Sequence, residues 1–525
     1  MPKSDIHSHT ASQNLPPTIL TIFGATGDLS ADYLIPALLH MDEHNLLPKD
    51  FKLVCVARRP FTPHHFFNNK QKASTKEKFE IKNFGFQNTA KSGAGLTAKN
   101  YLDFILKKSN VLKNVSAAKK SHFLKYLLYY QGDFEHIEHF TDLAKVLADH
   151  DQGTKHLCYN RLFYFATSPQ QFASITRILK AAGLLKACGA HQRESRVLVE
   201  KPFGFNLKSA QSLNQFLLKY FTEEQIYRID HYAGKETVQN LMVVRFANSL
   251  FEPLWNNRFI DHVEISVFED DGAAGRIGYY DSTGAIKDFL QNHILQMLAL
   301  IAMDEPYNLT AELIRDEKLK ILRALEPFGA EKLLSRLVKG QYEGYAKEAG
   351  AESGTETFFA LKTYINLPRW AGVPFYLRHG KKMPKKLTQI SVHFREPIRC
   401  LFEGCAANVL TFQIQPDESV HLQINNKIPG FGIKLHRADF EFGYSRAFKG
   451  ELPGAYERLL LDFLEGDQRL FIRSDEIEAA WKFVDSITQN AKFKSLPIYK
   501  YKAGSNGPKE ADEWIKRDAK EWRTR

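Results

Sequence analysis

The sequence contains few cysteines and no long apolar run. Five of its 525 residues are cysteine, and only Cys400 and Cys405 lie close together in the chain. No C-x-x-C or mixed Cys/His pattern predicts a metal site, and scattered thiols favour a reducing compartment. No segment approaches the run of about 18 apolar residues that crosses a bilayer. We therefore expect no bound metal and no membrane partner.

The first 17 residues, Met1–Pro17, form a polar leader without the apolar core and cleavage pattern of a signal peptide. We expect no export and a cytoplasmic location. The net charge is +11, but the basic residues are spread along the whole chain. This distribution favours attraction of small anions, and we expect no nucleic-acid partner. The length allows two or more domains with full hydrophobic cores.

The N-terminal part reads as the start of a dinucleotide-binding unit. Thr18–Phe23 is a predicted buried strand that runs into Gly24-Ala-Thr-Gly-Asp-Leu29, and Ala31–Met41 has helical spacing. Glycines between a strand and a helix let a pyrophosphate approach the helix N-terminus. Two glycines are a weaker signal than the full three-glycine fingerprint, so an ordinary strand-to-helix turn remains the alternative.

A second predicted strand, Phe51–Ala57, ends in Arg58-Arg59. An NAD enzyme usually carries an acidic residue there, whereas a basic residue favours the 2′-phosphate of NADP. Solvated surface charges are the alternative. An arginine can also stack on adenine without a 2′-phosphate, so NAD stays open as a secondary acceptor.

Three more apolar runs continue this pattern as parallel strands: Tyr126–Tyr130, Leu162–Ala166 and Arg196–Val199. The last leads into Glu200-Lys201-Pro-Phe-Gly204. A lysine just beyond a strand lies where ligands bind in open α/β sheets, although Lys201 could also cap a turn. We predict a Rossmann-like domain over residues 18–227.

The second half has a different periodicity. Four segments alternate apolar and polar residues, as half-buried antiparallel strands do: His262–Phe268, Gln389–Phe394, Asn408–Ile414 and Val420–Ile424. Helical patterns cover Ala285–Met303 and Ala311–Leu325. We predict that residues 228–525 form a larger α+β domain, with a mainly antiparallel sheet covered by helices.

The segment Arg228–Glu236 places six polar or ionisable side chains in nine residues. Helical spacing begins at Lys235, so His231, Tyr232 and Lys235 are predicted to lie at a helix N-terminus. Free backbone N–H groups and the helix dipole favour an anion there. A charged loop that leads into a helix is the alternative.

His293 lies on the apolar stripe of a predicted helix over Ile286–Met297. On spacing alone, a buried structural histidine is the more favoured interpretation. Asp288 is five residues earlier, which is a different face of an α-helix, so we do not expect the helix itself to pair the two side chains.

Four motifs occur in an order that resembles the glucose-6-phosphate dehydrogenase family: Gly24–Leu29, Glu200–Gly204, Arg228–Glu236 and Gln291-Asn-His293. The resemblance extends from about Thr18 to Asp512. It implies oxidation of D-glucose 6-phosphate at C1 by NADP, with release of the 1,5-lactone, as the first step of the oxidative pentose phosphate pathway. It also implies a homodimer or homotetramer.

The resemblance assigns roles residue by residue. His293 is the implied base that takes the C1 hydroxyl proton, and Asp230 is its carboxylate partner, an arrangement that suits imidazole near neutral pH. The implied substrate-binding residues are His231, Tyr232, Lys235, Lys201, Glu269, Asp288, Lys381 and Lys386. The implied cofactor-binding residues are Gly24, Thr26, Gly27, Asp28, Leu29, Arg58, Tyr129 and Lys201.

The chain departs from the family pattern at Tyr33, where members carry a lysine close to the substrate. The loss of this charge predicts weaker sugar-phosphate binding with catalysis retained. Rival hypotheses are the same chemistry on another phosphorylated hexose or on free glucose, and a cofactor-binding protein with little activity.

Overall fold

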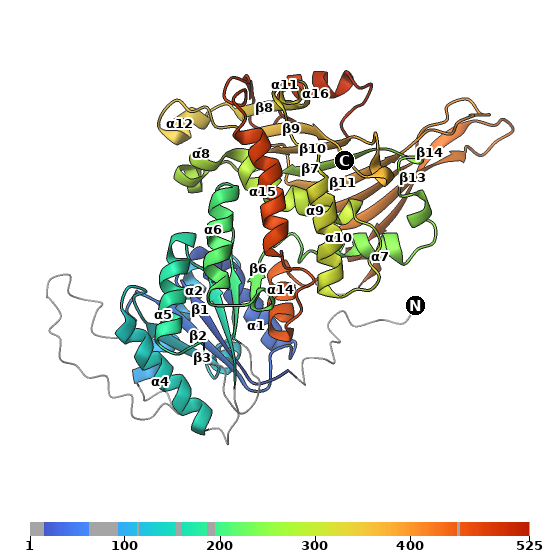
Figure 1. Ribbon diagram of the computed structural model, residues 1–525. Coiled ribbons are helices and arrows are strands. Elements are labelled where there is room, and N and C mark those ends of the chain that lie inside the picture. The colour runs from blue at the N-terminus through green and yellow to red at the C-terminus, as the bar shows by residue number, and fades with distance from the viewer. Residues whose placement is uncertain are drawn as a thin grey trace.

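The computed structural model describes residues 15–61, 93–112, 115–153, 159–185, 195–448 and 452–523. These residues form two sheets with their helices (Figure 1). Most of the predicted polar leader lies outside the described residues, as do Cys158 and Cys188. No helix in the described ranges has both the length and the apolar character needed to cross a membrane.

The first sheet has six parallel strands in the order β3-β2-β1-β4-β5-β6. They are β1 (Thr18–Phe23), β2 (Phe51–Ala57), β3 (Leu127–Gln131), β4 (Asn160–Phe165), β5 (Ser195–Val199) and β6 (Ile226–Arg228). The five strands expected from the sequence are present. We did not predict β6, because three residues are too few to show a period.

Helices connect these strands and cover both faces of the sheet (Figure 1). They are α1 (Ile35–Glu43), α2 (Gly93–Lys108), α3 (Ala117–Phe123), α4 (Ile137–Gly153), α5 (Phe172–Ala181) and α6 (Leu207–Leu218). The strand order reverses between β1 and β4, which is the ligand-binding switch point of a Rossmann fold. The helix predicted after β1 is present, but its first turn is a π-helix, η2 (Ser30–Leu34).

The second sheet has nine strands in the order β14-β13-β12-β11-β7-β10-β9-β8-β15. They are β7 (Ile260–Phe268), β8 (Leu337–Tyr342), β9 (Phe358–Thr363), β10 (Phe375–Gly380), β11 (Leu387–Phe394), β12 (Val409–Gln415), β13 (Ser419–Lys427), β14 (Leu435–Gly443) and β15 (Ile498–Tyr501). Only the β7–β10 and β8–β15 pairs are parallel. The predicted fold class of both domains is confirmed.

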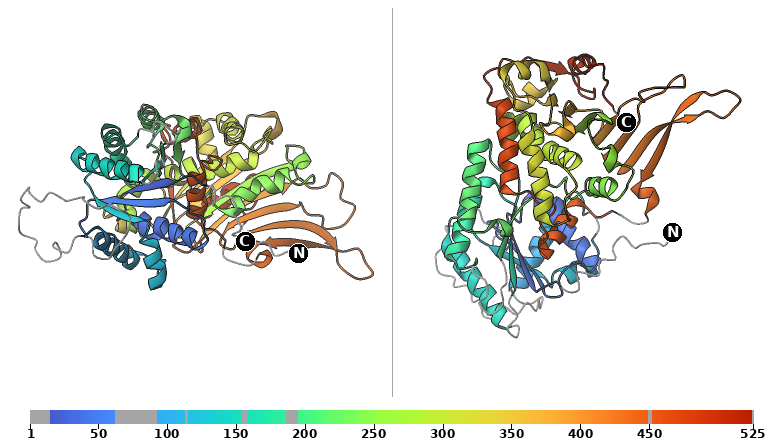
Figure 2. Two further views of the ribbon diagram at one scale, coloured as in Figure 1. Left: turned by 90° about the horizontal axis from the view of Figure 1, so that it is seen from below. Right: turned by 45° about the vertical axis from the view of Figure 1, so that its right-hand side comes forward.

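Sequence patterns found four of the nine strands. The missed strand β10 is buried at every position but contains Arg378, His379 and Gly380, so it shows neither alternation nor a continuous apolar run. The missed strand β14 is mostly exposed, and it projects with β13 away from the body of the protein (Figure 2). Alternation of apolar and polar residues requires a strand with one buried and one solvent-exposed face, and neither strand has that environment.

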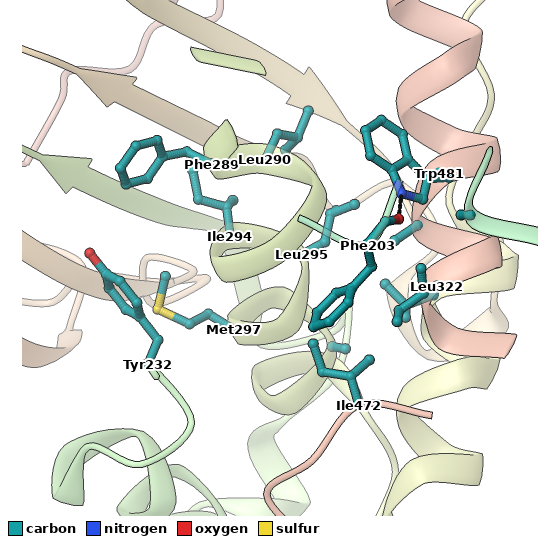
Figure 3. Packing of buried hydrophobic residues seen from close by; sticks show 14 of the residues in the cluster. Phe203, Tyr232, Phe289, Leu290, Ile294, Leu295, Met297, Leu322, Ile472 and Trp481 are labelled. Atoms are coloured by element: carbon teal, nitrogen blue, oxygen red, sulfur yellow. Dashed lines mark hydrogen bonds between the residues drawn. The ribbon is translucent and has the colours of Figure 1, made fainter. Parts of the chain in front are cut away.

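Helices lie on both faces of the second sheet. They include α7 (Glu236–Phe246), α8 (Ile277–Ala285), α9 (Leu295–Ala302), α10 (Ala311–Ala324), α11 (Ala330–Arg336), α12 (Tyr345–Ala349), α13 (Tyr444–Ala447), α15 (Ser474–Thr488) and α16 (Lys509–Lys516). Helices α9 and α10 pack on the face that borders the main core, and α16, which carries Trp514, packs on the opposite face against Tyr376. The helix predicted over 285–303 is present, but residues Ile286–Ile294 form a π-helix, η8, ahead of α9. Its apolar side chains enter the main core (Figure 3).

The chain returns to the first domain near its C-terminal end. Helix α14 (Ala455–Glu465) packs beside α1, and Leu459 and Phe463 belong to the same buried cluster as β1 and β2. The two halves of the protein therefore share a continuous apolar contact. This contact fixes the first sheet relative to the loops at the edge of the second.

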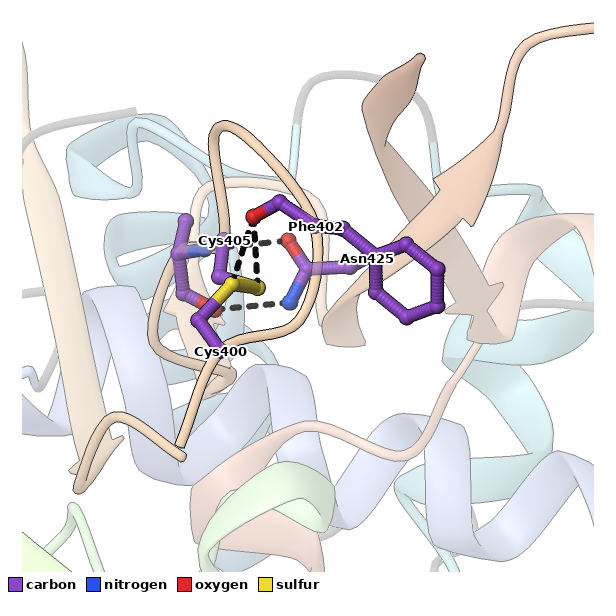
Figure 4. The surroundings of a disulfide bond; sticks show 5 residues. Cys400, Phe402, Cys405 and Asn425 are labelled. Carbon is purple, nitrogen blue, oxygen red and sulfur yellow. Dashed lines mark hydrogen bonds between the residues drawn. A yellow bond between two sulfur atoms is a disulfide. The ribbon is translucent and has the colours of Figure 1, made fainter. Parts of the chain in front are cut away.

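The structure contains a disulfide between Cys400 and Cys405 in the loop from β11 to β12 (Figure 4). Its half-cystines are five residues apart in the sequence, and Asn425 on β13 holds the loop through two hydrogen bonds to the backbone of Ala406. This pairing was not predicted from the sequence. Cys55 is free and buried.

Candidate active site

His293 and Asp230 are in direct contact although 63 residues separate them. Nδ1 of His293 lies 2.5 Å from Oδ1 of Asp230, and both side chains are about 1% exposed. The backbone N–H of Tyr232 donates a second hydrogen bond to the same carboxylate oxygen, at 3.0 Å. Within the described residues, Oδ2 of Asp230 has no hydrogen-bonding partner.

Lys201 contacts the other side of the His293 ring. Its Nζ lies 2.8 Å from Nε2 of His293. An ammonium group can only donate, so this contact requires a lone pair on Nε2 and a proton on Nδ1 directed at Asp230. The ring is thereby held as the neutral tautomer whose free nitrogen can accept a proton.

The π-helix changes the predicted relation between Asp288 and His293. Nζ of Lys201 also lies 3.5 Å from Oδ1 of Asp288, so both side chains approach the same ammonium group. The expectation of separate faces is wrong, because η8 has the wider turn of a π-helix, in which residues five apart are neighbours. A helix with i, i+4 bonds would rotate Asp288 away from Lys201.

The loop that carries Lys201 is fixed on both sides. Glu200 accepts a hydrogen bond from the hydroxyl of Tyr164 at 2.6 Å, and the Lys201–Pro202 peptide is cis. Trp481 of α15 donates to the carbonyl of Phe203 at 2.9 Å, as Figure 3 shows. The first sheet and the helical layer of the second domain thus position the lysine together.

The electrostatic environment favours a neutral imidazole beside a charged carboxylate. Burial lowers the pKa of His293, and the charge of Lys201 lowers it further, while Asp230 opposes both effects. Burial alone would raise the pKa of Asp230. The attraction and hydrogen bond of the His293 Nδ1–H group, with the hydrogen bond from the Tyr232 backbone, outweigh that cost and hold the pKa of Asp230 well below its usual range.

His231, Tyr232 and Lys235 lie next to this pair. The ring centroids of His231 and Tyr232 are 4.8 Å and 4.2 Å from that of His293, and Nζ of Lys235 is 5.8 Å from the Tyr232 ring. Burial lowers the pKa of Lys235, and Lys386 lowers it further through like-charge repulsion. Two cations that repel each other beside hydroxyl and imidazole groups form a place for an anion.

The helix N-terminus predicted at Lys235 is present, since α7 begins at Glu236. A carboxylate of the same chain already contacts this end. Glu418, in the turn from β12 to β13, accepts hydrogen bonds from the backbone N–H of Thr237 at 2.7 Å and from its hydroxyl. Side chains, more than free backbone N–H groups, therefore supply the attraction for an anion here.

Two further predicted residues come from the ends of adjacent parallel strands. Glu269 follows β7 and Lys381 follows β10, and their side chains form an ion pair. Nζ of Lys381 lies 5.1 Å from the ring of Tyr280 and 5.7 Å from that of Phe289, which is also near His293. Glu269 and Lys381 are therefore on the same side of η8 as Asp288 and the Asp230–His293 pair.

The first glycine of the β1 turn is required by the backbone. Gly24 has φ of +85°, and an added Cβ would lie 2.3 Å from the carbonyl oxygen of Ala166 at the end of β4. Gly27 donates to the carbonyl of Gly24 at 3.0 Å, which closes the turn before Leu29 and η2. The turn therefore lies at the switch point of the sheet.

Other predicted cofactor residues surround the same sheet edge. Lys108 of α2 contacts the carbonyl of Thr26 at 2.8 Å and the carboxylate of Asp28 at 2.9 Å. Arg58 follows β2 and is exposed. The Tyr129 hydroxyl donates to the carbonyl of Arg59, so this buried ring supports the loop that carries Arg58.

The residues at this edge suit a nicotinamide dinucleotide. Thr167, just beyond β4, has a buried hydroxyl without a hydrogen-bonding partner among the described residues, and its methyl group lies where a Gly24 Cβ would point. The edge thus combines a tight glycine turn, an orphaned hydroxyl donor and an exposed arginine. These groups match what phosphates and a ribose require.

Comparisons with protein families agree with this geometry. The family model described as "Glucose-6-phosphate dehydrogenase, NAD binding domain" matches residues 21–93 and 84–240, and "Glucose-6-phosphate dehydrogenase, C-terminal domain" matches residues 242–523. The chain belongs to the glucose-6-phosphate dehydrogenase family.

Individual glucose-6-phosphate dehydrogenases are similar over almost the whole length. The glucose-6-phosphate 1-dehydrogenase of Treponema pallidum is 39% identical, with 98% of this chain and 96% of the relative covered. The enzyme of Borreliella burgdorferi is 38% identical, with 95% and 97% covered. A solved glucose-6-phosphate dehydrogenase in complex with its substrate glucose 6-phosphate has a TM-score of 0.82 and 29% identity, with 98% of this chain and 100% of that chain covered.

The structure adds one aromatic residue to the site of this glucose-6-phosphate dehydrogenase family member. The Tyr456 ring on α14 stacks parallel to His231 at 6.2 Å, lies 5.0 Å from Tyr33, and its hydroxyl is 3.5 Å from Glu200. Tyr456 belongs to the stretch Ala455–Leu459, which matches the family pattern, but nothing in its local spacing indicates a site. Only the packing of α14 against the first domain brings it there.

Proposed function

We propose that this protein oxidises D-glucose 6-phosphate at C1 with NADP and forms 6-phospho-D-glucono-1,5-lactone and NADPH, the first step of the oxidative pentose phosphate pathway. The observation that carries the proposal is the buried Asp230–His293 pair, whose free ring nitrogen faces Lys201. A base of this kind beside a cationic pocket suits removal of a proton from a sugar phosphate.

In this proposal, Nε2 of His293 takes the proton of the C1 hydroxyl. The hydroxyl replaces the ammonium of Lys201 as the partner of Nε2, and Lys201 moves toward the substrate oxygen. Asp230 holds Nδ1 protonated and stabilises the imidazolium that forms. When bound, the nicotinamide supplies the hydride acceptor for C1.

The phosphate of the substrate contacts Lys235, His231 and Tyr232, with Lys386 at the entrance. Burial, together with the charges of Lys201 and Lys235, keeps the pKa of His231 well below its usual range. His231 therefore acts as a neutral hydrogen-bond donor, while the lysines supply charge. Loss of turnover when the phosphate is removed from the sugar would support this assignment against free glucose.

The sugar hydroxyls contact Glu269, Asp288 and Lys381. The Glu269–Lys381 pair and Asp288 flank Phe289, so their polar atoms border one apolar surface near the base. Carboxylates that accept from vicinal hydroxyls orient C1 toward Nε2 of His293. This orientation distinguishes glucose 6-phosphate from other phosphorylated hexoses, which place one hydroxyl differently.

We assign nicotinamide dinucleotide binding to residues 18–227, with substrate binding and oligomerisation in residues 228–525. Arg58 is the residue that favours NADP over NAD, because its guanidinium matches a 2′-phosphate. NAD remains a secondary acceptor. Gly24, Thr26, Gly27, Asp28 and Leu29 hold the pyrophosphate at the start of η2.

We also propose a homodimer or homotetramer that associates through the second sheet, in the cytoplasm. Strand β14 and its flanking turns expose the large apolar side chains Phe431, Phe440 and Phe442. Exposed apolar groups on a projecting sheet favour association with another copy. Light scattering on the purified protein tests this: a monomer would contradict it.

Steady-state assays of NADPH absorbance test the reaction. We expect turnover with glucose 6-phosphate and NADP, less with NAD, and little with glucose or with hexoses phosphorylated elsewhere. An inactive parent protein that still binds NADP would instead support the cofactor-binding hypothesis.

A further inference from the structure

We propose that His262, Glu264 and His393 form a second polar site, which binds a divalent transition-metal cation of the zinc class. The site lies in the nine-stranded sheet and does not depend on the proposed reaction. Its three donor atoms, Nε2 of His262, Oε1 of Glu264 and Nε2 of His393, lie within 4.8 Å of one another. Two imidazoles and one carboxylate are a common ligand set for zinc.

The sheet itself brings these residues to one face. His262 and Glu264 are two residues apart on β7, so their side chains point the same way. Strand β11 pairs antiparallel with β7, and His393 is the direct partner of His262 in that register. The backbone therefore holds all three ligands, and the two imidazole rings stack with centroids 4.0 Å apart.

The three donor atoms lie close together but form no hydrogen bonds of acceptable geometry with one another. Nε2 of His262 is 3.5 Å and Nε2 of His393 is 2.8 Å from Oε1 of Glu264. All three atoms are buried, and none forms a hydrogen bond of acceptable geometry within the described residues. Two ligands that bind one zinc ion tetrahedrally at about 2.1 Å lie about 3.4 Å apart. These separations require only small side-chain movements to bind an ion.

Neighbouring groups orient the ligands by contacting the atoms that are not directed at the proposed ion. Oδ2 of Asp261 lies 2.6 Å from Nδ1 of His262, an arrangement that leaves Nε2 of a neutral ring as the metal-binding nitrogen. Oε2 of Glu264 accepts a hydrogen bond from the backbone N–H of Arg523 at 2.9 Å, so Oε1 remains for the ion. Carboxylate–histidine pairs of this kind are typical supports of metal ligands.

The site also connects the sheet to the C-terminal segment. Lys520 contacts Asp261, while Arg378 and Gln389 donate to the carbonyl oxygen of Arg523 at 3.2 Å and 2.8 Å. A bound cation would fix Glu264 and, through it, the backbone of residue 523. We therefore expect metal binding to raise the melting temperature and to protect the C-terminal segment from carboxypeptidase.

The test uses the full-length protein after treatment with a chelator. We expect one zinc ion per chain by titration calorimetry and elemental analysis, and the visible absorption of tetrahedral cobalt when Co²⁺ replaces zinc. His393→Gln and Glu264→Gln should each weaken zinc binding by at least about 100-fold, because even outer-sphere partners contribute about 10–100-fold. Asp261→Asn, which retains all three ligands, should weaken it by about 10–100-fold.

Two control variants distinguish zinc binding at this site from zinc binding by other histidines. His436→Gln, at an exposed position on β14, should leave zinc binding unchanged. His293→Asn removes a member of the only other group of this kind among the described residues, Asp230, His231 and His293, and should also leave one ion bound.

Three results would overturn the proposal. They are no stoichiometric zinc binding by the parent protein, binding that survives both His393→Gln and Glu264→Gln, and loss of the ion in His293→Asn alone. If the ligand variants do not fold, the cobalt spectrum of the parent and the affinity of Asp261→Asn decide the question.

Discussion

Two buried histidine–carboxylate groups in this protein differ in what surrounds them. In the first, His293 is paired with Asp230 through Nδ1, and its Nε2 faces the ammonium of Lys201. In the second, both His262 and His393 direct Nε2 at Glu264, inside a paired sheet and beneath the C-terminal segment. The residue types are the same, but only the first group borders lysines that a substrate can displace.

The surroundings of the two groups shift the pKa of His293 and that of His262 in opposite directions. Burial and the Lys201 charge lower the pKa of His293, which favours a proton acceptor. In the second group burial also lowers the pKa of His262, but its carboxylate neighbours Asp261 and Glu264 outweigh burial and raise it. An imidazole beside a lysine can accept a proton from a substrate, whereas an imidazole between fixed carboxylates retains its proton more strongly until a metal ion displaces it.

The largest expected effect comes from His293→Asn, which removes the base and keeps the side chain's approximate size. We expect kcat to fall by about 10²–10⁴-fold, the usual contribution of a general base. His436→Gln is the matched control and should retain full activity. Steady-state kinetics check this. An active His293→Asn enzyme would show that His293 is not the base.

Asp230→Asn should lower kcat by about 10²-fold, because an amide no longer fixes the tautomer of His293. The pH dependence gives a second measurement. The base must be deprotonated, so kcat/KM rises with pH through the pKa of His293, which lies below the ordinary histidine value. Asp230 raises that pKa, so its loss should move the acid limb to lower pH. If the acid limb of the kcat/KM profile stays at the same pH or moves to higher pH, the proposed pairing of Asp230 with His293 is wrong.

Lys235→Met tests whether the cations beside His293 bind the phosphate. Loss of a charged hydrogen bond of about 1.5–3 kcal/mol should raise KM for glucose 6-phosphate about 10–100-fold, with a smaller change in kcat. Lys434→Met, at an exposed position, is the control. Equal KM values in both variants would place the phosphate elsewhere.

Arg58→Ala should reduce the preference for NADP over NAD by about 10-fold, because the exposed guanidinium contributes a screened, charge-assisted contact. The ratio of kcat/KM for the two cofactors is the measurement. A ratio that does not change would leave Arg58 as a solvated surface charge.

The smallest effect is expected from Tyr33→Lys, which restores the lysine of the family pattern. Tyr33 is about half exposed and packs against Tyr456, so a lysine there acts through solvent. We expect KM for glucose 6-phosphate to fall about 2–5-fold with kcat nearly unchanged. An unchanged or higher KM would show that Tyr33 does not weaken substrate binding.

Several elements were predictable because they are continuous apolar runs with clear ends. The strands Thr18–Phe23 and Phe51–Ala57 were placed at their observed bounds, since each is an apolar run that ends at a turn or a charge. Strand β10 was not, because Arg378 and His379 interrupt its apolar run although every position is buried. The π-turns of η2 and η8 were not, because a π-turn depends on tertiary packing. The Cys400–Cys405 disulfide and the His262–Glu264–His393 group also lack a sequence pattern.

The sequence by itself determined the two-domain architecture, the glycine turn after the first strand and the density of ionisable groups around residue 230. The tertiary structure decided which of those groups meet. His293 looked like a core histidine until the ends of β5 and β6 and the π-helix brought Lys201, Asp230 and Asp288 to it. Local patterns record burial and backbone preference, whereas contacts between distant segments depend on how whole elements pack.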